Sequence, residues 1–225
     1  MENSQDIDSR AYHLVELDIA RSLDDPRRVM PVIPSECRRI LDVGCGAGQT
    51  LIASDLDLET FACGVDPDFE ALRLGARLTP RVQFVCALGE DLPIRSAYFD
   101  LVISRVALPL MNIPNALAEI ARVLKPGGTL WLVLHPCSMT WRELGRRLRA
   151  FHVKGIVFRL YVLLNGLALH LLGKSFACPF VGRHESFQTR GGMRRALRAA
   201  GCDRVEIGGS ERSFVVTARK VPEPR

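Results

Sequence analysis

The amino-acid sequence predicts an α/β fold built on one doubly wound, largely parallel sheet of seven strands, with the last strand antiparallel. Two observations predict it. Short apolar runs bounded by Gly, Asp or Pro alternate with helical stretches, and a helix followed by two further runs closes the chain. The 225 residues are 48% hydrophobic and 24% charged, an ordinary composition for one globular domain, so we expect a single domain over residues 1–225.

Five short apolar runs are the predicted parallel strands. Buried parallel strands consist of continuous apolar segments rather than alternating ones, and these runs fit that pattern. They fall at residues 39–43, 61–66, 82–86, 101–104 and 129–134. Helical spacing between the runs predicts helices at 49–55, 68–78 and 115–124.

The C-terminal part predicts a helix and a strand pair. Thr189 is a candidate N-cap for a helix at 191–200. Two apolar runs follow it, at 204–207 and 213–219. A hairpin added to a parallel sheet makes its last strand antiparallel, which brings the total to seven strands.

Residues 139–187 do not fit the alternation and predict a helical insert between the fifth strand and the last helix. Trp141, Leu144, Leu148 and Phe151 share one face of a first helix. A second, more apolar helix is predicted at 156–172, and its 17 residues are short for a bilayer span. Because basic residues accompany this apolar helix, a second interpretation is peripheral contact of 142–172 with an anionic membrane surface.

A glycine-rich turn, DVGCGAG at 42–48, follows the first predicted strand directly before a helix. Glycines let the backbone approach a ligand closely, and a helix N-terminus offers N–H groups to an anion. Asp66 ends the second strand 22 positions after Gly44, a spacing that suits an acid binding ribose hydroxyls. The alternative is that Asp66 caps the next helix, a role that Asp68 can also fill.

These motifs, with two later segments, resemble the successive signatures of the class I S-adenosylmethionine-dependent methyltransferases. The similarity is greatest to the type 11 group, which includes quinone-biosynthesis enzymes. The segments are ILDVGCGAGQT, GVDPDFEAL, ALGEDLPIRSAYFDLVIS and AEIARVLKPGGTLWLVLHP. They keep the order and spacing of the family over about residues 38–136, which is more specific than any single motif.

The resemblance implies a Rossmann-like fold with S-adenosylmethionine as cofactor and S-adenosylhomocysteine as product. It divides the chain into four parts. These are an N-terminal helical cap (1–37), a cofactor-binding core (38–136), a lid or acceptor-binding insert (137–188), and the last helix with the C-terminal strand pair (189–225).

The resemblance also implies the cofactor-binding residues. The glycine loop lines the methionine part, Asp66 binds the ribose, Pro67 packs on the adenine, and Ser104 lies beside the methionine end. Leu88 stands where the family often has an aspartate, so only backbone contacts near Gly89 and Glu90 are implied for adenine. The complete set is Asp42, Gly44, Gly46, Gly48, Asp66, Pro67, Leu88, Gly89, Glu90 and Ser104.

Two histidines are candidate general bases. A sulfonium methyl group is already electrophilic, so such an enzyme chiefly orients the acceptor, and a base helps if the acceptor is a hydroxyl. His135 follows the fifth strand at the carboxyl edge of the sheet, and His184 precedes the last helix. The alternatives are that His135 bonds a loop carbonyl and that His184 pairs with Glu185.

The acceptor is expected to be a small apolar or aromatic molecule, with oxygen as the first candidate atom. Phe151, Phe158 and Tyr161 in the insert are candidate acceptor-binding residues, and Tyr12 on an N-terminal helix is a fourth. Core packing within the insert explains the first three equally well. We expect a monomer or homodimer.

Charge and cysteine patterns exclude several other classes. The net charge of +5 is concentrated at 142–159 and 183–198 without an RNA-binding signature, which argues against a nucleic-acid partner. Seven cysteines occur singly, so we expect reduced thiols and no metal site. The polar start of the chain predicts a cytoplasmic location. An RNA or protein methyltransferase and a non-catalytic S-adenosylmethionine-binding regulator remain as alternative functions.

Overall fold

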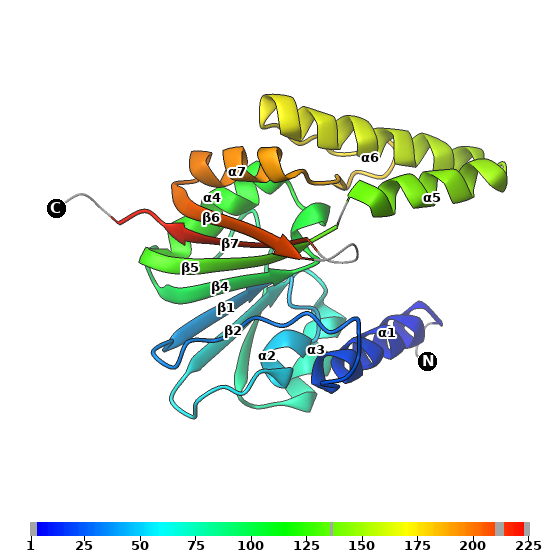
Figure 1. Ribbon diagram of the computed structural model, residues 1–225. Helices are drawn as coiled ribbons and strands as arrows, with labels where there is room; N and C mark the ends of the chain where they lie inside the picture. Colours follow the sequence, from blue (N-terminus) through cyan, green and yellow to red (C-terminus); the bar gives the residue numbers. More distant parts are fainter. Residues whose placement is uncertain (1–3, 136, 210–213, 223–225) are drawn as a thin grey trace.

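A seven-stranded sheet forms the centre of the computed structural model, which describes residues 4–135, 137–209 and 214–222, with the side chains of 4–9 and 137 excluded. The strand order is β3-β2-β1-β4-β5-β7-β6 (Figure 1). The strands are β1 (Arg39–Val43), β2 (Phe61–Asp66), β3 (Val82–Cys86), β4 (Phe99–Arg105), β5 (Leu124–Leu134), β6 (Cys202–Gly209) and β7 (Phe214–Lys220). Strand β7 runs antiparallel to both neighbours, so the predicted fold class is confirmed.

The helices cover both faces of this sheet and the edge formed by the carboxyl ends of its parallel strands. They are α1 (Ser4–Arg21), α2 (Gln49–Ala53), α3 (Phe69–Leu78), the 3₁₀ turn η1 (Leu108–Leu110), α4 (Ile113–Val123), α5 (Cys137–Arg149), α6 (Val153–Leu172) and α7 (Arg190–Ala199). Helices α4 and α7 pack on one face, where apolar side chains of β1, β4, β5 and β7 meet them. Side chains such as Ile40 and Ile103 point to the other face, toward Leu51 of α2 and the segment before β1.

Side chains cap the N-termini of α3 and α7, two helices of the core. Asp68 accepts hydrogen bonds from the N–H groups of Glu70 and Ala71 at the start of α3. Thr189 accepts one from the N–H of Gly192 at the start of α7, as its position in the sequence predicts. These caps fix where each helix begins, and therefore where the loops at the sheet edge leave it.

Several boundaries differ from the prediction. Strand β5 begins at Leu124, directly after α4, instead of at 129, and α6 begins at Val153 instead of Ile156. Helix α6 therefore has 20 residues, and the argument that it is short for a bilayer span is wrong. The predicted turn near 208–213 includes residues 210–213, which lie outside the described part of the chain.

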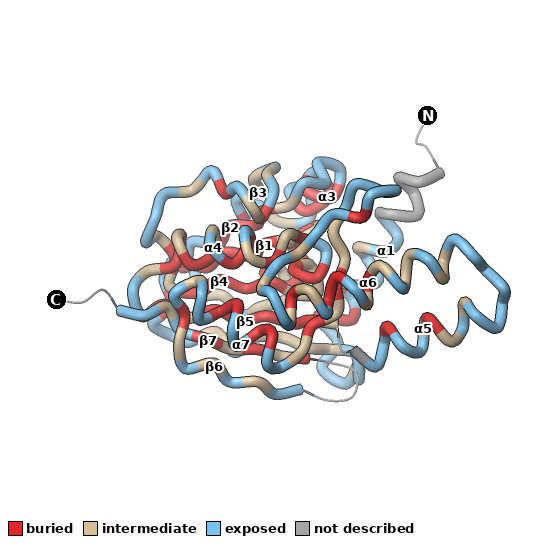
Figure 2. The backbone as a smooth tube through the Cα atoms, turned by 90° about the horizontal axis from the view of Figure 1, so that it is seen from above, coloured by how far each residue is buried: buried red, intermediate tan, exposed pale blue. Residues whose placement is uncertain are grey.

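The two irregular parts of the fold lie beyond the same edge of the sheet. Helix α1 and the hairpin formed by α5 and α6 both lie past the carboxyl ends of the parallel strands (Figure 1). Figure 2 shows the hairpin extending away from the sheet, with most of its length exposed. Ligands of doubly wound sheets bind at this edge, so both parts are placed to enclose a site.

Candidate active site

A cavity of about 370 Å³ lies at the carboxyl edge, between the glycine loop and α1. We call it the glycine-loop cavity. Its lining comes from α1, the loop after β1, the ends of β2, β4 and β5, and η1. The lining residues are Tyr12, His13, Glu16, Gly44, Cys45, Gly46, Gln49, Thr50, Asp66, Arg105, Val106, Ala107, Leu110 and His135.

The glycine loop has no room for a side chain at any of its three glycines, and two of these, Gly44 and Gly46, line the cavity. A Cβ at Gly44 would lie 2.1 Å from Ala107 Cβ, and one at Gly46 would lie 2.9 Å from His13 Cε1. Both glycines have positive φ, 75° and 55°. The N–H groups of Gly44 and Cys45 donate to Val65 O at 2.7 and 3.1 Å, so these amides are occupied within the protein. The loop therefore lets a ligand approach its backbone closely, but the N–H groups of Gly44 and Cys45 already donate within the protein.

Asp66 connects the second strand to the glycine loop. Its Oδ2 accepts a hydrogen bond from Gly46 N at 2.8 Å, and its Oδ1 accepts one from Asp68 N at 2.8 Å. The helix cap itself is Asp68, so the alternative of Asp66 as the cap is wrong. Each carboxylate oxygen retains a further lone pair, which leaves Asp66 able to accept from a ligand hydroxyl in the cavity.

Among the described residues, two buried oxygens beneath the loop have no hydrogen-bond partner. They are Asp42 Oδ1 and Ser104 Oγ, on side chains that are 1% and 0% exposed. Burial raises the pKa of Asp42 to about 7, and the nearby Arg105 guanidinium opposes that rise. An unpaired buried oxygen is costly, so these two sites favour a ligand that donates hydrogen bonds.

Arg105 joins α1 to the core. Its Nη2 lies 3.1 Å from Glu16 Oε2, and its Nε donates to Thr50 Oγ1 at 3.2 Å. On the same helix, His13 Nδ1 lies 2.8 Å from Gln49 Nε2. Helix α1 is therefore held against the glycine loop by polar contacts at two points.

The segment predicted to contact adenine holds the start of α4. Glu90 Oε1 accepts a hydrogen bond from Asn112 N at 2.7 Å, and a Cβ at Gly89 would lie 2.7 Å from Met111 Sδ. Leu88 and Pro67 are exposed beside this segment. Of the ten predicted cofactor residues, those that line the glycine-loop cavity are Gly44, Gly46 and Asp66.

A second cavity, of about 300 Å³, lies under the helical insert. We call it the insert cavity. Its lining residues are Leu110, His135, Met139, Thr140, Glu143, Arg146, Arg159, Val162, Glu185 and Ser186. Its charges are paired: Arg159 Nη1 lies 2.7 Å from Glu185 Oε1, and Glu143 contacts Arg146 and Arg147. Leu110 and His135 also line the glycine-loop cavity, so the two cavities share a wall.

His135 stands in that shared wall. Burial lowers the pKa of its imidazole, with Glu185 raising it and Arg159 lowering it further. A neutral imidazole at neutral pH is able to accept a proton. His184 is not among the residues that line either cavity, and its Nδ1 lies 3.1 Å from Ser175 Oγ. The alternative pairing of His184 with Glu185 is also wrong, because Glu185 contacts Arg159.

The predicted acceptor-binding aromatics do not line the insert cavity. Phe151 lies past the end of α5 and is 87% exposed, and of the residues predicted to share its face Leu144 is buried while Trp141 and Leu148 are exposed. The Tyr161 hydroxyl donates to Phe176 O at 2.7 Å and accepts from Glu185 N at 3.2 Å, which fixes the loop after α6. Phe158 stacks near Tyr161 and Arg159. Tyr12 lines the glycine-loop cavity instead.

Comparison with known proteins identifies the core. A family model described as a methyltransferase domain matches residues 41–132, which include the glycine loop, Asp66, strands β2 to β4 and most of β1 and β5. The chain contains a class I S-adenosylmethionine-dependent methyltransferase domain of the type 11 group. The cofactor of this family is S-adenosylmethionine.

Relatives of this methyltransferase domain differ in what their names say they methylate. The chain is 33% identical to a malonyl-[acyl-carrier protein] O-methyltransferase of Herminiimonas arsenicoxydans, over 54% of this chain and 48% of that protein. It is 30% identical to a ubiquinone/menaquinone biosynthesis C-methyltransferase of Campylobacter jejuni, over 58% of each. The chain thus spans about half the length of the curated relatives it matches.

The fold of the methyltransferase domain also has solved counterparts. One is the protein solved in complex with the Trm112 methyltransferase activator of Haloferax volcanii. The TM-score is 0.63 at 16% identity, covering 98% of this chain and 99% of that one. At this identity the likeness concerns the fold alone.

The residues of the methyltransferase domain fit its cofactor. The methionine part carries an ammonium group, and the oxygens of Asp42 and Ser104 that lack partners among the described residues are acceptors of suitable chemistry, buried beneath the cavity rather than in its lining. Asp66 is suited to ribose hydroxyls, and the crowded Gly44 and Gly46 leave the cavity floor as bare backbone. The sequence predicts the N-terminal helix as a cap but does not mark Glu16, Gln49 or Thr50 as lining residues. The adjacency of Gln49 to Gly48 is a usable signal, whereas nothing local marks Glu16.

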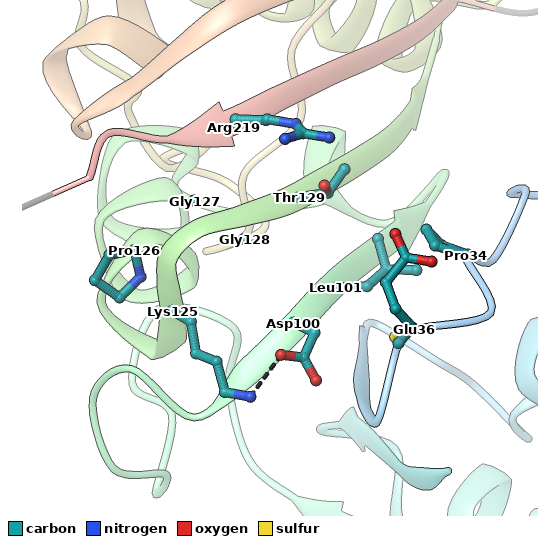
Figure 3. Close-up of a pocket in the computed structure, with 11 residues that line it drawn as sticks. Pro34, Glu36, Asp100, Leu101, Lys125, Pro126, Gly127, Gly128, Thr129 and Arg219 are labelled. Carbon is teal, nitrogen blue, oxygen red and sulfur yellow. Dashed lines mark hydrogen bonds and ion pairs between the residues drawn. The ribbon is translucent and has the colours of Figure 1, made fainter.

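A hollow at the opposite edge of the sheet is not part of this site (Figure 3). There Lys125 Nζ lies 2.5 Å from Asp100 Oδ1, and Asp100 Oδ2 accepts from the N–H groups of Arg38 and Arg39. These groups satisfy one another at the amino ends of β1 and β4. Asp100 therefore stabilises the amino ends of strands β1 and β4.

Proposed function

We propose that this chain transfers the methyl group of S-adenosylmethionine to an oxygen of a small-molecule acceptor. The observation that carries the proposal is the wall shared by the glycine-loop cavity and the insert cavity. Leu110 and His135 belong to both, so a ligand in one cavity adjoins a ligand in the other at this point. Methyl transfer requires such adjacency, because the acceptor atom must approach the methyl carbon in line.

S-adenosylmethionine, when bound, supplies an electrophilic methyl group on a sulfonium. The chain itself binds the cofactor and the acceptor and excludes water from them. Asp42, Ser104 and Asp66 are the groups that we assign to cofactor binding. His135 is the group that we assign to accept the acceptor's proton, because burial keeps its imidazole neutral. Helix α1 and the hairpin cover the two cavities and exclude water.

The lining of the insert cavity favours an acceptor with an apolar body and a polar reacting end. Met139 and Val162 provide apolar surface, and Thr140 and Ser186 provide hydroxyls. Its charged residues are paired with one another, which supports a neutral acceptor over an ionic one. A hydroxylated aromatic or lipid-like compound has this chemistry, in agreement with the lipophilic acceptor expected from the sequence.

Calorimetric titration with S-adenosylmethionine and S-adenosylhomocysteine, with NAD as control, tests the first half of the proposal. We expect micromolar binding of the first two and none of NAD. Gly46→Val is expected to block binding, because its Cβ meets His13 and its φ is 55°. Absence of binding by the folded wild type would remove the cofactor assignment.

Transfer of tritium from methyl-labelled S-adenosylmethionine to a panel of lipophilic phenols and alcohols tests the second half. Label in an ether product supports the proposal. Tight cofactor binding with no transfer to phenols, alcohols, tRNA or protein would instead indicate a non-catalytic S-adenosylmethionine-binding protein. Label in tRNA or protein alone would indicate a macromolecular acceptor.

A further inference from the structure

Helix α6 exposes apolar side chains along its whole outer side. Its eight exposed residues are Val153, Lys154, Val157, Leu160, Leu164, Leu167, Leu171 and Leu172, and all but one are apolar. A surface helix of a globular protein ordinarily exposes polar residues and buries apolar ones. In α6 the polar Asn165 is buried instead, at 3% exposure, and donates to Glu185 O at 2.9 Å. The exposed face therefore marks an interaction surface.

The apolar residues form one continuous stripe. Val157, Leu160, Leu164, Leu167 and Leu171 follow one another at alternating intervals of three and four residues, so they share a side of the helix. A 20-residue helix is about 30 Å long, and the stripe covers most of that length. Figure 2 shows the α5–α6 hairpin extending beyond the end of the sheet, with most of its length exposed.

Positive charge accompanies this stripe. Helices α5 and α6 with their turn contain six arginines and lysines and one glutamate, a net charge of +5 that equals the formal net charge of the whole chain. Four of the cations are exposed: Arg142, Arg146, Arg149 and Lys154. Arg142, Arg146 and Arg149 line a groove on α5 together with Trp141, which is 58% exposed.

This combination points to a lipid surface that carries negative charge. Apolar side chains enter the boundary between headgroups and acyl chains, and nearby arginines and lysines contact lipid phosphates. An interface between two copies of the hairpin would bring these like charges together, which costs energy. Two exposed aromatic residues among these cations, Trp141 near the start of α5 and Phe151 in the turn before α6, also suit the membrane interface.

The hairpin geometry favours lying on the membrane over crossing it. Among the described residues, α6 is the one helix long and apolar enough to span a bilayer, and 22% of that window is buried. Helix α5 packs beside α6 and carries Arg142, Glu143, Arg146, Arg147 and Arg149. A spanning orientation would draw these charges into hydrocarbon, which is strongly unfavourable.

We propose that the α5–α6 hairpin docks this protein on an anionic lipid surface, with the stripe of α6 buried in the boundary region and the four exposed cations against lipid phosphates. This inference rests on the hairpin alone and not on methyl transfer. The residues of the stripe line neither cavity, nor do Arg149 and Lys154, so the two proposals can fail separately.

Vesicle flotation of the full chain tests the proposal. Vesicles of phosphatidylcholine mixed with phosphatidylglycerol are compared with pure phosphatidylcholine. We expect binding to the first, little to the second, and a decrease as salt is raised. Leu164→Gln/Leu167→Gln is expected to lower partitioning at least about tenfold, since it removes two exposed leucines from the stripe. Arg149→Gln/Lys154→Gln is expected to lower it on anionic vesicles alone.

Matched controls are available elsewhere on the surface. Leu23→Gln/Leu58→Gln changes two leucines that are 79% and 85% exposed outside the hairpin, and Arg77→Gln changes an exposed cation of α3. These variants are expected to bind vesicles as the wild type does. Unaltered cofactor titration of every variant shows that each one is folded.

Tryptophan fluorescence locates the contact. The chain has two tryptophans, Trp131 in the sheet at 9% exposure and Trp141 on α5. Quenching by brominated anionic lipid is expected in the wild type and lost in Trp141→Phe. Absence of vesicle binding would overturn the proposal. So would a concentration-dependent dimer, seen by light scattering and abolished by Leu164→Gln/Leu167→Gln, because the stripe would then be an interface between copies.

Discussion

Arg105 at the end of β4 contacts Glu16 of α1, with 3.1 Å between Nη2 and Oε2, although 88 residues separate them in the sequence. Both side chains are largely shielded, at 13% and 25% exposure. A charged hydrogen bond in such a place stabilises more than one on open surface. The contact closes one wall of the glycine-loop cavity.

We predict that this pair stabilises the packing of α1 against the glycine-loop cavity. In a double-mutant cycle of Glu16→Ala and Arg105→Ala, the coupling in the free energy of unfolding is expected to be about 1–2 kcal/mol. S-adenosylhomocysteine affinity is expected to fall about tenfold, or about 1.4 kcal/mol, in Glu16→Ala. The exposed pair Arg38 and Glu59, 3.9 Å apart, serves as control with coupling near zero. Equal coupling in both cycles would contradict the prediction.

The buried Asp42 predicts an unusual pH dependence of stability. Its pKa is raised from 3.8 to about 7 in the folded protein, so its stabilising contribution is complete below pH 3.8 and is lost as pH rises through about 7. Without cofactor, Asp42→Asn is therefore expected to be more stable than the wild type at pH 8. Chemical denaturation of both proteins at pH 5 and at pH 8 measures this difference. Its S-adenosylmethionine affinity is expected to fall. A constant stability difference between pH 5 and 8 would contradict the pKa argument.

Asp66 and Asp68 are predicted to separate cofactor binding from helix capping. Asp66→Ala is expected to weaken S-adenosylhomocysteine binding at least about tenfold, because it removes the acceptor beside Gly46. Asp68→Ala removes the cap of α3 and is expected to cost about 1 kcal/mol of stability with little change in affinity. Calorimetry and thermal unfolding on both variants check this, and the reverse pattern would sink the assignment.

His135 is predicted to act as the proton acceptor in methyl transfer. Because the pKa of His135 is lowered from 6.5, kcat/KM for an alcohol acceptor is expected to rise with pH and then reach a plateau. The midpoint of that rise is expected at a pH below 6.5. His135→Gln is expected to reduce kcat about a hundredfold or more while S-adenosylhomocysteine affinity changes little. His184→Gln, away from both cavities, is the control. A profile unaltered in His135→Gln would exclude the role.

Tyr161 is predicted to be structural. Its hydroxyl contacts Asn165 Nδ2, Glu185 N and Phe176 O, so Tyr161→Phe removes one hydrogen-bond partner from each, and the first two are half-buried. We expect a loss of about 1–3 kcal/mol of stability and no change in acceptor KM beyond what unfolding explains. A large rise in KM in a fully folded variant would return Tyr161 to the acceptor site.

The sequence predicted those parts of the fold that have local causes. Strand β1, the glycine turn and Asp66 follow one another within a short stretch, and Thr189 caps the helix right after it. The Glu16–Arg105 contact has no local signal, since it depends on how α1 returns to the sheet. For the insert, the sequence leaves an acceptor pocket, core packing and membrane contact open, and the outer side of α6 proves to be exposed. Periodicity identifies a face but not what covers it.

Strand β7 comes after β6 in the chain but lies between β5 and β6 in the sheet. A ribosome therefore releases β6 before any neighbour exists for it, and the outer edge of β5 keeps its backbone groups unpaired until Phe214 and the residues after it have emerged. The sheet cannot be completed during synthesis of residues 1–209, so its closure is a late step that follows the cofactor-binding half.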